Sequence, residues 1–462
     1  HLLLAADVGL ELGSPEKRIE LVIGMNSGGV YADTSLITGN KFNGWISSFS
    51  VGRRVGGYSA GDNRGKFDLS AVTEPGLLDI SGDVMIGWNR MGEGRVVVSD
   101  AIDVKIGSAE KRGGFLQIGS ISNAGRDLES SLVLGCGRFD AYVTNLEVGA
   151  GQADGLLDAS KVSEGVLDVL GHVYVASLYN KPGRVFLSEG VRVKIGRPES
   201  RSEFILAGGE TSTGIFEAKS DRWTAYLSSL TIAEPYSRSG TTGVLDLGEV
   251  NEGVLDISGS LRMGLNRYAS ATLRLSSGFS TRIGAATNRA VLAIADGERW
   301  IDVEMAAAGV FEAYLSDLIV GRRKYIIAGV PGHAILDLSR VTNGVLDVAG
   351  DMIVGSGPQA AGSDGRATVV LPEIPVCAGS LSVGTITNNN ASGHLVMTGT
   401  VFSVNGPVVV GPGASLAEGR ISTTLHGKSG GLDLGPAATL EVYQGVLEIV
   451  FADPPTDSRQ TY

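Results

Sequence analysis

The sequence has few cysteines, few aromatic residues and few charges. Of 462 residues, two are cysteines (Cys136 and Cys377), 6% are aromatic and 19% are charged. Disulfide frameworks and zinc sites need cysteines in recurring sets, and two cysteines at non-equivalent places in the sequence exclude such a framework. No run approaches 18 apolar residues, so the sequence predicts no membrane span.

Basic stretches are also scarce. The formal net charge is −12, and the longest basic clusters are Arg53-Arg54 and Arg322-Arg323-Lys324. Binding to nucleic acid requires a basic stripe that releases counterions from the phosphates. The sequence therefore predicts no nucleic-acid partner.

Glycine and aliphatic residues are abundant instead. There are 67 glycines but only 14 prolines, no Gly-X-Y period is present, and 43% of the residues are hydrophobic. Such a chain can bury a large core, which excludes wholesale disorder. Many glycines between short aliphatic runs indicate short strands joined by tight turns.

One unit of about 90 residues recurs along the chain. Its most regular strand has the pattern Gly-x-Leu-Asp and begins at Gly76, Gly165, Gly253 and Gly344. These starts are 165−76 = 89, 253−165 = 88 and 344−253 = 91 residues apart. Repeats of this kind indicate a solenoid, in which each unit buries its apolar face only by stacking on its neighbours.

Within each unit, apolar and polar residues alternate over three to six positions, as they do in a strand with one buried face. We therefore predict an all-β fold, a single elongated β-solenoid or β-helix of short stacked strands with little or no helix. Each superrepeat of 88–91 residues is expected to form four coils averaging about 22 residues. The equivalent leucines Leu78, Leu167, Leu255 and Leu346 should point inward and be more than nine-tenths buried.

The repeat also predicts how the chain is divided. The expected segments are a partial first superrepeat (1–66), three superrepeats (67–157, 158–245 and 246–336), divergent carboxy-terminal coils (337–450) and an extended tail (451–462).

The Gly-x-Leu-Asp strands are followed by corners of an apolar residue and glycine, such as Val84-Met85-Ile86-Gly87 and Leu261-Arg262-Met263-Gly264. Over about residues 7 to 355, this pattern resembles the glycine-rich β-solenoid repeats of bacterial surface proteins and autotransporter-like passengers. The resemblance implies an extracellular or cell-surface location. It implies a role as a surface fibre, coat component or adhesin, with a minority of such proteins being polysaccharide-cleaving enzymes.

Aspartate recurs twice in each unit. One row is Asp68, Asp158, Asp246 and Asp337, and the other is Asp79, Asp168, Asp256 and Asp347. Rows of carboxylates could bind calcium, but each of these stands alone in its strand. We expect them instead to accept hydrogen bonds from turns or from Arg and Lys, and we predict no metal or cofactor.

Three other features were candidates for a chemical role. The segment Glu298-Arg299-Trp300-Ile301-Asp302 is charged and unlike the other copies, but an irregular corner is the favoured interpretation over a catalytic group. His172 replaces Asp83, Ser260 or Asp351 of the other copies and is expected at the surface. An aromatic residue recurs at Trp45, Tyr142, Tyr226 and Tyr314, where corner packing is favoured over a row of carbohydrate-binding rings.

These observations predict a structural protein that is not an enzyme, namely the subunit of an extracellular fibre or filament assembled head to tail from copies of itself. The expected assembly contacts are apolar residues of two uncapped strand regions: Leu2, Leu3, Leu4, Tyr443, Val446, Leu447, Ile449 and Phe451. The alternatives are an adhesin or carbohydrate-binding rod, whose partners would be glycans or a cell surface, and a polysaccharide lyase or hydrolase.

Overall fold

The computed structural model describes the chain from Leu2 to Phe451, except for a set of short segments. These are residues 6–7, 27–31, 55–62, 89–91, 121–128, 152, 178–180, 210, 235–239, 266–267, 298–299, 324–331, 357–364, 386–390, 399–400, 405–407, 411–419, 426–430, 435–439 and 443–445. The described residues form 37 β-strands and no helix. The predicted all-β class is therefore confirmed.

The chain divides into two compact units: His1–Ser228 with Thr241–Val254, and Ser229–Gly240 with Leu255–Tyr462. The strands of the first unit are β1 (Leu2–Leu3), β2 (Gly9–Leu12), β3 (Ile19–Asn26), β4 (Ala32–Ile37), β5 (Lys41–Arg54), β6 (Asn63–Leu69), β7 (Gly76–Ile80), β8 (Val84–Trp88), β9 (Gly92–Val98), β10 (Ile102–Ile106), β11 (Gly113–Ser120), β12 (Glu129–Leu134), β13 (Arg138–Val148), β14 (Asp154–Ala159), β15 (Glu164–Val169), β16 (His172–Val175), β17 (Gly183–Leu187), β18 (Val191–Ile195), β19 (Ser202–Leu206), β20 (Thr213–Ala218) and β22 (Thr241–Leu247).

Two strands contribute residues to both units: β21 (Arg222–Ile232) and β23 (Glu252–Met263). The strands of the second unit are β24 (Ala269–Leu275), β25 (Phe279–Ile283), β26 (Ala290–Gly297), β27 (Trp300–Arg323), β28 (Gly332–Ser356), β29 (Gly365–Leu371), β30 (Val376–Thr385), β31 (Ala391–Thr398), β32 (Val401–Val404), β33 (Val408–Val410), β34 (Arg420–Leu425), β35 (Gly431–Leu434), β36 (Leu440–Val442) and β37 (Val446–Phe451).

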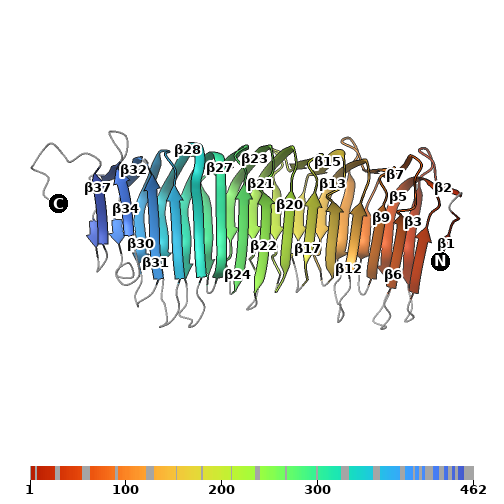
Figure 1. Ribbon diagram of the computed structural model, residues 1–462, viewed down its shortest axis with the longest axis horizontal. Coiled ribbons are helices and arrows are strands. Elements are labelled where there is room, and N and C mark those ends of the chain that lie inside the picture. The colour runs from red at the N-terminus through yellow and green to blue at the C-terminus, as the bar shows by residue number, and fades with distance from the viewer. Residues whose placement is uncertain are drawn as a thin grey trace, which may run out of the picture. The chain divides into compact units, whose positions relative to one another are not determined.

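Each unit is a parallel β-solenoid in which one turn consists of three strand segments. In the first unit, β6 pairs with β9, β7 with β10 and β8 with β11, and all three pairings are parallel. The strands of successive turns consequently stack side by side within each unit (Figure 1). Three sheets thus run through successive turns, and we number them by the order in which the chain enters them. The first sheet contains β6 and β9, the second β7 and β10, and the third β8 and β11.

The predicted coil length is wrong. In the second sheet Ile80 lies opposite Ile106, Ile106 opposite Ala141 and Ala141 opposite Leu167. The chain therefore returns after 106−80 = 26, 141−106 = 35 and 167−141 = 26 residues, and one superrepeat makes three turns rather than four. The prediction failed because apolar-Gly corners also separate strands of different sheets, so neighbouring corners are not one full turn apart. Ile86 and Ile106, only 20 positions apart, belong to β8 and β10, which lie in different sheets.

The core follows the predicted alternation. Leu78 and Leu255 are each 1% exposed, and Leu167 and Leu346 are completely buried, so these inward positions are confirmed. Neighbouring turns repeat the pattern and stack aliphatic side chains on one another, with aromatic pairs in places. Phe67, for example, packs edge-on against Phe42 and Phe49 at centroid distances of 5.6 and 5.4 Å. Burial of this ladder is the main source of stability.

Glycine has two separate roles in the repeat. At the corner after β10, Gly107 has a φ of 64°, a left-handed conformation that glycine adopts without steric cost. At the start of the Gly-x-Leu-Asp strand, Gly165 instead allows a close approach, because a Cβ there would lie 1.9 Å from the carbonyl oxygen of Phe139. The recurring glycines thus mark both corners and tight contacts between turns.

Candidate functional site

The first row of aspartates closes turns. A carboxylate oxygen of Asp68 accepts a hydrogen bond from the backbone N–H of Ser70 at 2.9 Å, and Asp158 and Asp337 do the same for Ser160 and Ser339 at 3.1 and 2.9 Å. Asp246 accepts one from the backbone of Gly248 at 3.0 Å. This is the local turn chemistry for which aspartate is favoured.

In the second row, Asp79, Asp168 and Asp347 are held by arginines from earlier turns, and Asp256 is held by Arg282 from the next turn. Nη1 of Arg18 donates to the carbonyl oxygen of Ile46, one turn ahead, at 3.4 Å and to that of Asp79, two turns ahead, at 3.0 Å. The same guanidinium bonds both carboxylate oxygens of Asp79 at 3.0 and 2.9 Å. One side chain thus links three turns, and we call this arrangement an arginine staple.

The staple recurs along the chain. Arg112 bonds the carbonyl oxygens of Val143 and Asp168 at 3.4 and 3.0 Å and the Asp168 carboxylate at 3.0 Å. In the second unit, Arg289 bonds the carbonyl oxygens of Leu315 and Asp347 at 3.1 and 3.0 Å and the Asp347 carboxylate at 2.8 Å. The expectation that these carboxylates accept bonds from arginine is confirmed.

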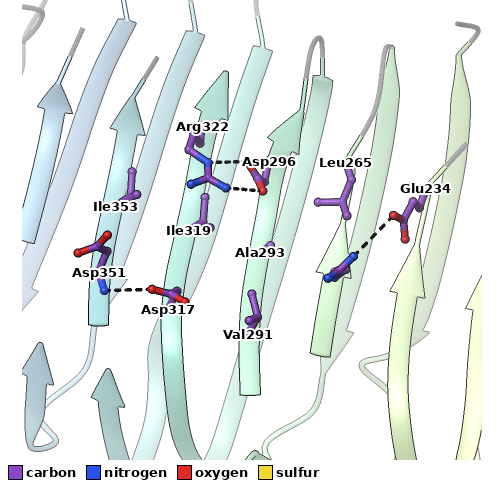
Figure 2. Close-up of a pocket in the computed structure, with 11 residues that line it drawn as sticks. Glu234, Leu265, Val291, Ala293, Asp296, Asp317, Ile319, Arg322, Asp351 and Ile353 are labelled. Carbon is purple, nitrogen blue, oxygen red and sulfur yellow. Dashed lines mark hydrogen bonds and ion pairs between the residues drawn. The ribbon is translucent and has the colours of Figure 1, made fainter. Parts of the chain in front are cut away.

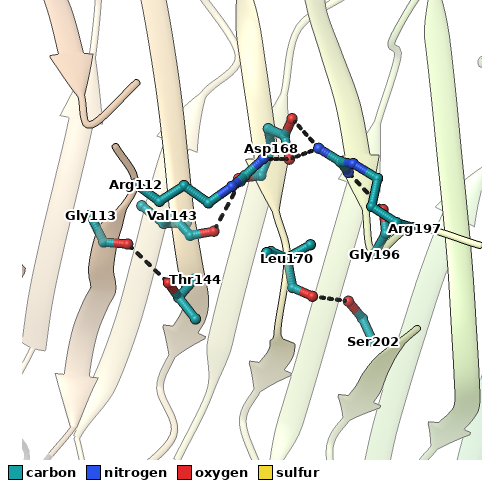
Figure 3. A network of polar contacts seen from close by, with 9 residues as sticks. All are labelled: Arg112, Gly113, Val143, Thr144, Asp168, Leu170, Gly196, Arg197 and Ser202. Atoms are coloured by element: carbon teal, nitrogen blue, oxygen red, sulfur yellow. Dashed lines mark hydrogen bonds and ion pairs between the residues drawn. The ribbon is translucent and has the colours of Figure 1, made fainter. Parts of the chain in front are cut away.

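Asp168 has the densest network of the row. Arg197, from the corner between β18 and β19, approaches from the side opposite to Arg112 and bonds both carboxylate oxygens at 2.9 and 2.7 Å (Figure 3). The side chain of Asp168 is only 4% exposed. Charge-assisted hydrogen bonds of this kind are roughly twice as strong as bonds between neutral groups. The Asp168 carboxylate therefore has a structural role, since both of its oxygens bond arginines from other turns.

The recurring aromatic residues do not lie at corners, so that expectation is wrong. Trp45 and Tyr142 lie within β5 and β13, half-buried, and their backbone neighbours one turn ahead are Asp79 and Asp168. The guanidinium of Arg112 lies 6.0 Å from the centroid of the Tyr142 ring. The ring therefore covers part of the staple rather than a corner.

The second unit contains a shallow hollow of about 460 Å³ on the outer face of its third sheet (Figure 2). Its floor is apolar and its rim is charged. The lining residues are Glu234, Arg262, Leu265, Val291, Ala293, Asp296, Asp317, Ile319, Arg322, Asp351 and Ile353.

Most of the charged side chains that line this hollow bond groups on neighbouring turns. Arg322 donates to both carboxylate oxygens of Asp296 at 2.7 and 2.9 Å, and these bonds raise the pKa of the Arg322 guanidinium. Arg262 lies 3.9 Å from Glu234. Asp317 accepts a bond from the backbone N–H of Asp351 at 3.2 Å, and Asp351 accepts one from the hydroxyl of Ser380 at 2.6 Å. The rim chiefly links neighbouring turns.

A cluster of aromatic and polar side chains lies on the third sheet of the first unit, and the sequence analysis did not identify it as a site. Phe115 is 37% exposed, and its ring centroid lies 6.4 Å from that of His172. The His172 ring stacks on Tyr174 with centroids 4.1 Å apart and an angle of 23°. We call these three residues, together with Gln117, Glu147 and Glu203, the aromatic cluster.

A departure from the repeat could have identified the aromatic cluster. Tyr174 occupies the place that Met85, Arg262 and Ile353 hold in the other copies. His172 departs from the other copies and was expected at the surface, and its side chain is partly buried, with 25% exposed. The signal was missed because each residue was weighed alone, whereas the coiling brings Phe115 and His172, 57 positions apart, into one cluster.

The predicted assembly contacts are only partly described. Leu2 and Leu3 form β1 and are 51% and 67% exposed, and the backbone N–H of Leu4 donates to the carbonyl oxygen of Ile37 at 3.1 Å. Val446, Leu447, Ile449 and Phe451 lie in β37, which pairs with β34, and only their backbone is described. Tyr443 lies outside the described residues.

Within the described part of the chain, no group of three or more His, Cys, Asp and Glu side chains is placed to hold a metal ion. Glu298 and Arg299 fall outside that part, and Asp302 contacts His333 at 3.3 Å. The same described ranges include no helix that is long and apolar enough to span a membrane.

Known proteins provide no relative from which a function could be transferred. No family model matches the chain, and neither a curated protein nor a solved structure is significantly similar to it.

Proposed function

We propose that the protein is a structural subunit that stacks end to end with copies of itself into a fibre. The observation that carries the proposal is the recurrence of the arginine staple. Arg18, Arg112 and Arg289 each bond the two turns that follow, in the same way. A unit that repeats its strongest polar contacts to link its turns is suited to a mechanical role.

Exposed apolar surface on the first turn supports the assembly part of the proposal. The large apolar side chains exposed among the described residues are Leu2, Leu3, Val8 and Phe115, and the first three belong to the first turn. Strand edges with apolar side chains favour pairing with another chain. A contact between two different surfaces of one protein generates a filament when the rotation does not close.

The location proposed for such a subunit is outside the cell or at the cell surface. Its support is the resemblance of the Gly-x-Leu-Asp strands to the repeats of bacterial surface solenoids. We propose no catalytic activity, because the recurring carboxylates are occupied by turn and staple bonds.

The assembly is tested by sedimentation velocity over a range of protein concentrations. We expect the intact chain to form concentration-dependent oligomers. The double variant Leu2→Lys/Leu3→Lys should sediment as a monomer, because two lysines at this surface replace apolar contact by charge repulsion. The matched control is Ala71→Lys/Ala109→Lys, which adds the same charge at two exposed positions and should assemble like the intact chain.

Circular dichroism confirms that each variant remains folded. A monodisperse monomer for the intact chain at high concentration would refute end-to-end stacking. Equal assembly of the two double variants would show that Leu2 and Leu3 are not at the contact.

A further inference from the structure

The aromatic cluster projects outward from four successive strands of the third sheet. In β11, β13, β16 and β19 the alternate residues are fully buried: Leu116, Ile118, Leu146, Val148, Val173, Val175, Phe204 and Leu206. The residues between them therefore point away from the core. Gln117 lies opposite Glu147, Glu147 opposite Tyr174, and His172 opposite Glu203, so the side chains form a continuous patch.

The rings of the patch form an apolar surface. His172 and Tyr174 stack nearly parallel, with centroids 4.1 Å apart, and Phe115 lies beside His172 at 6.4 Å. Each of the two stacked rings covers one face of the other, so a ligand can pack only on the ring faces that point away from the pair. The Phe115 side chain is 37% exposed, so its ring is accessible to a ligand beside the stacked pair.

Polar side chains border this surface, and hydrogen bonds fix their orientation. Glu147 Oε1 lies 3.0 Å from Nε2 of His172, and Glu147 Oε2 accepts a bond from the amide of Gln117. The Tyr174 hydroxyl donates to Glu203 Oε2 at 2.6 Å. Each carboxylate is thus oriented by a ring of the patch, and carboxylate oxygens can accept more than one bond.

We propose that the aromatic cluster is a binding site for a neutral glycan. A sugar ring has an apolar C–H face, which packs on the electron-rich face of an aromatic ring, and hydroxyls at its edge, which bond carboxylates and amides. Phe115 and Tyr174 supply the first kind of contact. Gln117, Glu147 and Glu203 supply the second.

Charge and size define the ligand further. Glu147 and Glu203 make the patch negative, and they repel uronate or sulfated sugars. Four neighbouring strands about 4.8 Å apart span roughly 14 Å, which is longer than one sugar ring. The ligand class is therefore an uncharged oligosaccharide or a segment of a polysaccharide.

The site is not a by-product of the repeat. At the position of Tyr174 the other copies have Met85, Arg262 and Ile353, and at the position of His172 they have Asp83, Ser260 and Asp351. A row required for folding would recur once per superrepeat, as the staple does. The histidine and the tyrosine of the aromatic cluster each occur at only one of the four equivalent positions, which is expected of a site with its own ligand.

Isothermal titration calorimetry of the full chain tests the proposal with uncharged hexasaccharides of glucose, mannose and N-acetylglucosamine. We expect at least one to bind, and we expect both Phe115→Ala and Glu203→Gln to weaken that binding at least tenfold. Phe115 lies outside the core, so its variant should fold. Tyr314→Ala, which removes a half-buried aromatic of the second unit, is the matched control and should bind normally.

Hexagalacturonate and hexalysine provide the charged comparisons. Failure of all three neutral hexasaccharides to bind overturns the proposal, as does binding that Phe115→Ala leaves unchanged. Tighter binding of hexalysine than of any sugar would identify an acidic surface instead and would equally overturn it. The Leu2→Lys/Leu3→Lys variant should bind the sugar normally, which separates this site from the assembly contact.

Discussion

Leucine at the third position of the Gly-x-Leu-Asp strand packs identically in all four copies. For Leu255, which is 1% exposed, replacement by alanine removes apolar contacts and leaves a cavity between two turns. We expect Leu255→Ala to lower the free energy of unfolding by about 2–5 kcal/mol, measured by urea denaturation. Glu199→Ala, at an exposed corner, is the control and should change it by less than about 0.5 kcal/mol. A loss below about 1 kcal/mol for Leu255→Ala would contradict the packing.

The two cysteines should differ in reactivity. Burial raises the pKa of the Cys136 thiol to about 12, and the reactive species is the thiolate. At pH 8 its thiolate fraction is therefore on the order of 10⁻⁴. Burial also raises the pKa of Cys377, but that side chain is partly exposed. We expect a thiol reagent to label Cys377 first at pH 8 and the labelling of Cys136 to increase with pH. Equal rates in the folded protein would contradict this environment.

At the scale of the strand and its corner, the arginine staple holds three turns together. We expect Asp168→Ala to lower the free energy of unfolding by about 2–4 kcal/mol, because two arginines lose a buried partner while remaining partly solvated. Asp158→Ala removes only the two local bonds from Ser160 that close a turn and should cost about 0.5–1.5 kcal/mol. Urea denaturation of both variants measures the difference. Equal losses of unfolding free energy would mean that the arginine staple contributes no more to stability than the turn closed by Asp158.

The strands and the staple differ in how far the sequence predicts them. Alternation in Leu-Asp-Leu and Val-Lys-Ile segments is local, so it predicted the strands and the burial of Leu78 and Leu167. For Asp79 the sequence predicted hydrogen bonds from a turn or from an arginine or lysine. It could not identify the partner, because Arg18 precedes Asp79 by 61 positions and the pairing depends on the length of each turn. The aromatic cluster was missed for the same reason.

At the scale of the whole molecule, the superrepeat corresponds to three turns. Deleting residues 79–167 removes 89 residues and joins Leu78 to Asp168, so that Arg18 meets Asp168 in place of Asp79. We expect this shortened chain to fold, with the same circular dichroism per residue and a staple at the junction. Adding Asp168→Ala to the shortened chain should then destabilise it. An unfolded product would show that the copies are not interchangeable.

The staple has a consequence for the order in which the chain can fold. Arg112 precedes its partner Asp168 by 56 residues. Arg18 precedes its partner Asp79 by 61 residues. A nascent chain that emerges amino end first would therefore carry an unsatisfied guanidinium at its growing edge until two further turns have been added. Each new turn would be captured by an arginine already in place, so that growth in one direction is favoured over nucleation at random sites.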